Sequence, residues 1–150
     1  MKAKAILYWT TTSLIALETF LGGIMDLTHG RTAIVSGPLV TQVVTSLGYP
    51  VYILAIIGIL KVPGAITIMV PGFLRLKEWA YAGIVFELAG AVASHAACGQ
   101  WRDMMAPLSL LCVAIASWAL RPPGRILGTP LPTPSHAQAQ SSAGNVWVGF

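Results

Sequence analysis

Charged residues are scarce in this chain. Only 9% of its 150 residues are Asp, Glu, Lys or Arg, and 55% are hydrophobic, whereas a soluble domain is about 25% charged. A water-soluble fold of this size would lack the polar side chains needed to cover its surface. The composition therefore excludes an ordinary soluble domain and indicates an integral membrane protein.

Cysteine and metal-binding motifs are scarce as well. Cys98 and Cys112 form no CxxC pair, so a thiol–disulfide enzyme of the quinone-linked membrane type lacks its motif. No Glu-x-x-His pair of the di-iron carboxylate kind is present. His95 and Cys98 stand at i, i+3, but two ligands are too few for a metal site. We predict no metal, and the sequence names no cofactor, although a haem with one axial histidine stays open.

What the chain does have is long apolar runs. A bilayer core needs roughly 20 apolar residues in a helix, and four segments come close to that length: 6–25, 51–70, 79–97 and 104–120. The first run is longer than the ~7–15 apolar residues of a signal peptide and contains Glu18, so we treat it as a retained helix. Short connections favour antiparallel neighbours. We predict an all-α fold, an integral membrane antiparallel four-helix bundle formed by residues 1–121.

Basic residues predict how this bundle is oriented, because Lys and Arg are retained on the cytoplasmic side. Two basic residues fall on one side of the predicted bundle, Arg31 and Arg102. Six fall on the other, namely Lys2, Lys4, Arg75, Lys77, Arg121 and Arg125. Both termini are therefore predicted to be cytoplasmic in a multi-pass protein of the bacterial inner membrane. Topology explains the net charge of +4 without a nucleic-acid partner.

Two segments outside the spans carry weaker patterns. Between residues 26 and 50, apolar side chains recur at helical spacing (Leu39, Val43, Val44 and Leu47), which predicts either a short helix on the outer membrane surface or an ordered loop over the bundle mouth. From residue 122 onward the chain is rich in Pro, Ser, Ala and Gln. We predict that residues 122–150 form a disordered cytoplasmic tail.

Three charged residues fall inside the predicted spans at nearly the same depth. Glu87 and Lys61 lie near the centres of their spans, and Glu18 lies about 4 Å from the centre of its own, at 1.5 Å per residue. An unpaired charge at that depth costs about 2.5 kcal/mol or more. We therefore expect all three to face the bundle interior and to meet there.

Such a cluster suggests proton chemistry. Two carboxylates and one ammonium leave an excess negative charge in a poorly solvated place, so we predict that Glu18 or Glu87 holds a proton at neutral pH. Ser94 shares a helix face with Glu87, whereas His95 is turned roughly 80° away and belongs to an outer mouth. The candidate catalytic residues are Glu18, Glu87 and His95, and the candidate ligand-binding residues include Lys61 and Ser94.

Several strings in the chain resemble the DoxX-like family of small four-helix bacterial membrane proteins. They are "LGYP", "GILKVPGA", "LKEWAYAG", "FELAGAVASH" and "SWALRPPGR", between Leu47 and Arg125. The resemblance implies a four-helix membrane bundle. It also places Glu78 and Trp79, with Lys61, Glu87, Ser94 and His95, at motif positions, so Glu78 and Trp79 join the candidate ligand-binding residues.

The resemblance leaves the activity open, because members of the wider superfamily are linked to quinol oxidation, thiosulfate:quinone oxidoreduction, oxidative-stress complexes and membrane-protein chaperoning. Three hypotheses follow. The first is binding of a lipophilic, quinone-like molecule in a polar intramembrane pocket as part of redox metabolism. The second is a non-catalytic assembly partner or chaperone, acting on a membrane protein or on a second copy. The third is acid–base isomerisation or cyclisation of a lipophilic substrate. Membrane lipids are expected partners in all three.

Overall fold

The computed structural model describes residues 2–29 and 40–128. Within these ranges the chain forms five α-helices, one short 3₁₀ turn and no strand. The elements are α1 (Lys2–Leu27), α2 (Val40–Ser46), α3 (Tyr52–Met69), α4 (Leu74–Ala97), α5 (Trp101–Ala119) and the 3₁₀ turn η1 (Pro123–Arg125). The all-α fold predicted from the sequence is confirmed for this part of the chain.

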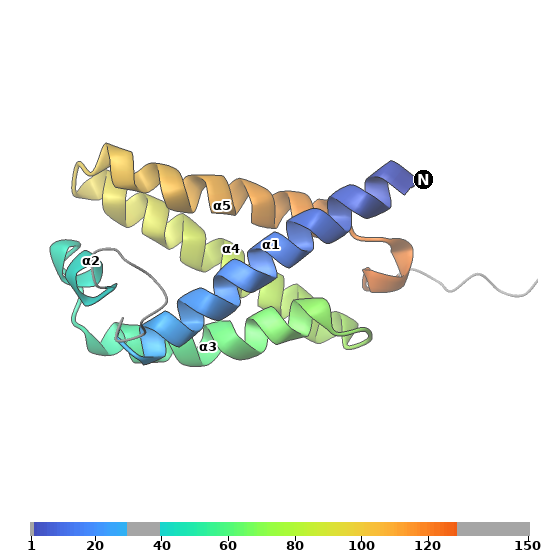
Figure 1. Ribbon diagram of the computed structural model, residues 1–150, viewed down its shortest axis with the longest axis horizontal. Helices are drawn as coiled ribbons and strands as arrows, with labels where there is room; N and C mark the ends of the chain where they lie inside the picture. Colours follow the sequence, from blue (N-terminus) through green and yellow to red (C-terminus); the bar gives the residue numbers. More distant parts are fainter. Residues whose placement is uncertain (1, 30–39, 129–150) are drawn as a thin grey trace, which may run out of the picture.

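The four long helices pack against one another in pairs. α1 packs against α3 and α5, and α4 also packs against α3 and α5, so each long helix has two long neighbours. Figure 1 shows α1 crossing the other helices obliquely, with its N-terminus and η1 near one end of the molecule and α2 near the other. We call the first the basic end, because Lys77, Arg121 and Arg125 lie there, and the second the α2 end.

Tight turns join α3 to α4 and α4 to α5. Gly72 and Gly99 occupy these turns with φ of +79° and +70°, a backbone conformation that glycine adopts without steric cost. The connections are short, residues 70–73 and 98–100, so consecutive helices run in opposite directions and lie side by side.

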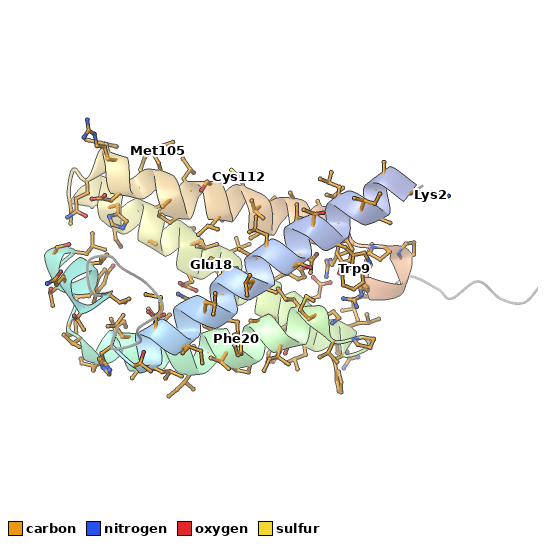
Figure 2. The ribbon with its side chains drawn as sticks, viewed as in Figure 1. Lys2, Trp9, Glu18, Phe20, Met105 and Cys112 are labelled. Carbon is orange, nitrogen blue, oxygen red and sulfur yellow. The ribbon has the colours of Figure 1, made fainter. Side chains whose placement is uncertain are left out.

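Large apolar side chains cover the outside of the helices. Leu60, Trp79 and Phe86 are 68%, 77% and 75% exposed, and Met105 and Cys112 are exposed on α5 (Figure 2). Several polar side chains are instead buried, among them Thr12, Thr19, Lys77, Ser117 and Arg121. Soluble monomers rarely expose extended apolar patches, so this distribution suits a surface that faces lipid.

Two of the described helices, α3 and α4, are long and apolar enough to cross a membrane. They contain residues 52–69 and 79–97 of the second and third predicted spans. The first and fourth predicted spans fall mainly within α1 and α5, and for these two helices membrane crossing stays a prediction.

The structure also bears on the two weaker patterns. Val43 and Val44 lie in α2, so a short helix forms where helical spacing allowed one, while Leu39 lies outside the described residues. Most of the predicted disordered tail, residues 129–150, also lies outside them. Residues 122–128 are described, and η1 places Arg125 against α1 and α3.

Candidate functional site

Lys61 is the centre of a charged cluster between three helices. Its Nζ lies 3.1 Å from Asp26 Oδ2 of α1 and 2.9 Å from Glu87 Oε1 of α4, while Lys61 itself belongs to α3. The side chains of Asp26, Lys61 and Glu87 are 7%, 14% and 26% exposed. One ammonium therefore links three helices, and Glu87 is the most accessible of the three groups.

Glu18 borders the same cluster beside Gly22. A Cβ placed on Gly22 would lie 3.4 Å from Lys61 Nζ and 3.6 Å from Glu18 Oε1, so both charges approach the same point on α1. Glu18 also accepts a hydrogen bond from the Thr19 hydroxyl at 3.5 Å. We call Glu18, Asp26, Lys61 and Glu87 the charged cluster.

Two glycines bring α1 and α3 close enough for Lys61 to reach Asp26. A Cβ on Gly23 would lie 2.8 Å from Lys61 Cβ, and a Cβ on Gly58 would lie 2.8 Å from the Gly23 carbonyl oxygen and 2.7 Å from Leu27 Cγ. All three distances are shorter than a Cβ contact allows. Small residues permit close backbone approach between membrane helices, and here that approach positions the ion pair.

The cluster combines three carboxyl groups with one ammonium. An ion pair taken out of water is favourable only with good geometry and further hydrogen bonds. Asp26 Oδ2 is buried and receives no well-directed hydrogen bond from the described residues, so its contact with Lys61 is an ion pair alone. In the same part of the chain no group of three or more His, Cys, Asp or Glu side chains is arranged to hold a metal ion. The arrangement suits exchange of a proton or a polar ligand group at Glu87.

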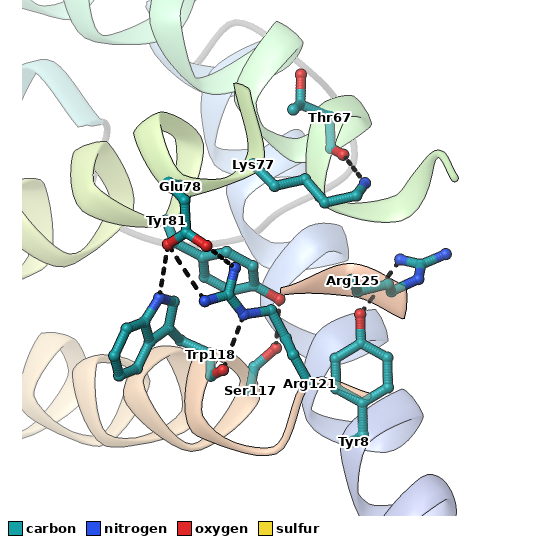
Figure 3. Close-up of polar contacts among 9 residues, drawn as sticks. All are labelled: Tyr8, Thr67, Lys77, Glu78, Tyr81, Ser117, Trp118, Arg121 and Arg125. Carbon is teal, nitrogen blue, oxygen red and sulfur yellow. Dashed lines mark hydrogen bonds and ion pairs between the residues drawn. The ribbon is translucent and has the colours of Figure 1, made fainter. Parts of the chain in front are cut away.

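A second polar group lies at the basic end, between α4 and the end of α5 (Figure 3). Arg121 donates to both oxygens of Glu78, at 2.7 Å and 3.2 Å, and the Trp118 indole N–H donates to Glu78 at 3.1 Å. The guanidinium carbon also lies 5.1 Å from the ring centre of Tyr81 and 5.2 Å from that of Trp118. The guanidinium thus combines a bidentate ion pair with two cation–π contacts, which lysine would not reproduce.

A buried chain of hydroxyl groups continues from Tyr81 into the helix packing. The Tyr81 hydroxyl lies 2.8 Å from Ser117 Oγ, and Ser117 Oγ lies 2.7 Å from Thr12 Oγ1. All three residues are almost fully buried. This chain of hydroxyl groups links α4, α5 and α1. Each hydroxyl has a hydrogen-bond partner, as buried polar groups require.

Two cations donate hydrogen bonds to the carbonyls at the C-terminus of α3. Lys77 donates to the carbonyls of Thr67 and Val70, and Arg125 donates to those of Ile68 and Met69, both at 3.1 Å. These are the carbonyls that the end of a helix leaves without intrahelical partners, and positive charge is favourable there. Arg125 further donates to the Tyr8 hydroxyl at 3.2 Å and lies over the Trp9 ring, so it ties η1 to α1 and α3 (Figure 3).

An apolar layer separates the charged cluster from these groups at the basic end. On α1, buried Ile15 and Ala16 lie between Thr12 and Glu18, and on α4 buried Ile84 lies between Tyr81 and Glu87. The charged cluster and the basic end are therefore two separate polar sites.

At the α2 end, His95 is buried and its Nδ1 lies 2.8 Å from Gln100 Oε1. Gln100 in turn donates to Ser46 of α2 at 3.5 Å. The Ser94 hydroxyl lies 2.9 Å from the Tyr49 hydroxyl and donates to the Gly90 carbonyl. Ser94 and His95 thus help to hold α2 and the residues after it against the α4–α5 turn.

A groove of about 520 Å³ lies between α4 and α5. It is lined by Glu78, Trp79, Tyr81, Ala82, Val85, Ile115 and Trp118. Apart from the Glu78 carboxylate and the polar atoms of Tyr81 and Trp118, this lining is apolar.

Comparison with protein families gives one assignment. The model of the DoxX-like family matches residues 10–117, a range that includes the charged cluster, Glu78 and His95. The chain belongs to the DoxX-like family. Comparison with curated proteins and with solved structures gave no match. The resemblance seen in the sequence is confirmed, and family membership with two span-length apolar helices makes this a small membrane protein.

The structure distributes the predicted site residues of this DoxX-like protein over three places. Lys61 and Glu87 are paired and Glu18 is beside them, as their common depth predicted. Glu78 and Trp79 line the groove near the basic end, and Ser94 and His95 lie at the α2 end.

Sequence reasoning missed two partners in the DoxX-like chain. Asp26 was placed beyond the first span, but α1 continues to Leu27 and carries it to Lys61. The signal was available, since Glu18, Gly22 and Asp26 follow one another at four-residue steps along a helix. Arg121 was counted only as a topological charge, and no local pattern pointed to Glu78.

Proposed function

We propose that this DoxX-like protein is a multi-pass protein of the bacterial inner membrane that binds a lipophilic, quinone-like molecule at the charged cluster. In this proposal α1, α3, α4 and α5 form an antiparallel four-helix bundle with both termini in the cytoplasm. The position of Lys77, Arg121 and Arg125 at one end supports the orientation, because basic residues are retained on the cytoplasmic side.

The observation that carries the proposal is the Lys61 ammonium shared between Asp26 and Glu87 at 3.1 Å and 2.9 Å. Ionisable groups within membrane helices are costly and mark ligand or proton sites by default. A quinone presents carbonyl oxygens, which accept from an ammonium, and a quinol presents hydroxyls, which donate to a carboxylate. Lys61 and the partly exposed Glu87 offer both complements at one place, so the cluster would suit both states of such a molecule within redox metabolism.

A second candidate function is a membrane assembly partner or chaperone. It is favoured by Trp79 and Phe86, which are seven residues apart on α4, share a helix face and are 77% and 75% exposed. The third hypothesis, acid–base isomerisation or cyclisation, receives less support for His95, because its Nδ1 contacts Gln100 at the α2 end. For that reaction Glu18 and Glu87 would be the acid and base.

The test is native mass spectrometry of the protein extracted gently from its own membrane. Wild type is compared with Glu87→Gln and Lys61→Met, and Asp103→Asn serves as a matched control because Asp103 is an exposed carboxylate at the start of α5. Added ubiquinone or menaquinone provides a defined probe if the native molecule is lost on extraction.

The proposal expects a small apolar molecule retained by wild type and Asp103→Asn and lost from both cluster variants. Equal retention of quinone by all four proteins would overturn it. A stoichiometric protein partner in every sample, with no small molecule in any, would transfer support to the assembly function.

A further inference from the structure

The groove between α4 and α5 is a second candidate binding site, separate from the charged cluster. Glu78 and Glu87 differ by nine residues on α4, which turns them roughly 180° apart around the helix. Glu87 faces Lys61 of α3, whereas Glu78 faces Arg121 and borders the groove. A molecule in the groove would therefore not contact the charged cluster.

The groove offers an apolar channel with a neutralised polar end. Ala82, Val85 and Ile115 form its apolar wall. The charge of Glu78 is balanced by the two hydrogen bonds from Arg121 and by the Trp118 N–H. An unbranched hydrocarbon chain suits this lining, since such a site buries apolar surface and leaves no charge unpaired.

An exposed cation, Arg75, lies on α4 before the polar end of the groove. Arg75 lies seven residues before Ala82 on α4, so the two share a helix face and Arg75 is one turn beyond Trp79. Arg75 is exposed and makes no ion pair with the described residues.

Charge distinguishes between the occupants that an apolar groove could take. Among the residues that the structure describes, the basic end has three exposed cations, Lys2, Lys4 and Arg75, and its buried and half-buried cations are already engaged in the contacts described above. A second copy in the same membrane orientation would bring the same positive charges to the same level and repel. Membranes with anionic headgroups attract basic residues at this level.

We propose that the α4–α5 groove holds an acyl chain of one anionic phospholipid whose phosphate is bound by Arg75. This lipid site is independent of the quinone-like molecule proposed for the charged cluster.

The experiment measures lipid binding to the purified full chain by native mass spectrometry. Phosphatidylglycerol and phosphatidylcholine with identical acyl chains are titrated separately. Arg75→Gln removes the cation, Val85→Phe fills the groove, and Arg102→Gln is the matched control, because Arg102 is exposed at the opposite end. Thermal unfolding of each variant in the same detergent verifies that it is folded.

Wild type and Arg102→Gln should bind phosphatidylglycerol more tightly than phosphatidylcholine. Arg75→Gln should weaken phosphatidylglycerol about fivefold, the effect of one basic residue near an anionic surface, and leave phosphatidylcholine unchanged. A folded Val85→Phe should weaken both lipids, and Ile115→Trp replaces it if it does not fold. Equal affinity of wild type for the two lipids, or an Arg75→Gln protein with unchanged selectivity, would overturn the proposal.

Discussion

Glu78 and Glu87 lie on opposite sides of the same helix, and each is paired with a cation outside it. Glu87 contacts Lys61 of α3 at 2.9 Å, and Glu78 contacts Arg121, just after α5, at 2.7 Å. α4 is therefore fixed by ion pairs to both of its long neighbours, at two depths separated by about 13 Å along its axis. Rotation of α4 would break both pairs together.

Lys61→Met should destabilise the protein more than the double change of Lys61→Met with Glu87→Gln. Removal of the ammonium leaves Asp26 and Glu87 without their cation, which costs about 3 kcal/mol when a buried pair is broken. Neutralising Glu87 as well should recover part of that loss. The free energy of unfolding in detergent, measured for both single variants and the double variant, tests this coupling. Strictly additive effects would contradict the shared ion pair.

Gly58→Ala and Gly64→Ala should change the free energy of unfolding in opposite directions, although both glycines lie on α3. A Cβ on Gly58 would be 2.8 Å from the Gly23 carbonyl oxygen, whereas a Cβ on Gly64 meets nothing within 4 Å. Overpacking should cost Gly58→Ala about 1–3 kcal/mol, and helix propensity should stabilise Gly64→Ala by up to about 1 kcal/mol. The free energy of unfolding, measured for both variants under the same conditions, tests this difference. Similar free energies for the two variants would argue against the close approach of α1 and α3.

Ser117→Ala should lower the free energy of unfolding by about 1–3 kcal/mol, because it leaves the hydroxyls of Thr12 and Tyr81 without their shared partner. Ser109 provides the control on the same helix, since its exposed hydroxyl contacts only the local Ala106 carbonyl. Ser109→Ala should change stability by less than about 0.5 kcal/mol. A Ser117→Ala protein as stable as wild type would show that the hydroxyl chain contributes nothing.

Lys77→Met should loosen the last turn of α3 by removing two donors to its carbonyls. Hydrogen bonds from charged groups are worth about 1.5–3 kcal/mol each, so we expect a loss of at least about 2 kcal/mol. Lys4→Met, at an exposed position near the same end, should be almost neutral. Hydrogen exchange of the amides near residues 66–70 would locate the change, and protection equal to wild type would contradict the capping role.

The common position of the charges within the predicted spans was the part of the site that sequence could predict. A charge in lipid is costly whatever the surrounding fold, so Glu18, Lys61 and Glu87 had to meet, and the structure places them together. Helix boundaries were less certain, because capping and fraying shift a helix end by one or two residues. The first predicted span ends at residue 25, whereas α1 ends at Leu27, and this shift left Asp26 out of the predicted cluster.

Other contacts depended on tertiary geometry that has no local signature. The pairing of Glu78 with Arg121 joins residues 43 apart, and the hydroxyl contact of Thr12 with Ser117 joins residues 105 apart. Neither spacing follows from periodicity. The all-α fold followed from composition and run length, whereas these partners follow from the way α1 and α4 pack against α5.

The cap of α3 has a consequence for the order in which the chain assembles during synthesis. Lys77 lies seven and ten residues after the carbonyls of Val70 and Thr67, so it is available as soon as the α3–α4 turn has been made. The carbonyls of Ile68 and Met69 wait for Arg125, which lies 57 and 56 residues downstream of them. An α3–α4 hairpin formed before that segment is synthesised therefore still lacks the donor to these two carbonyls. The last turn of α3 gains its full set of side-chain donors only when the segment after α5 has left the ribosome.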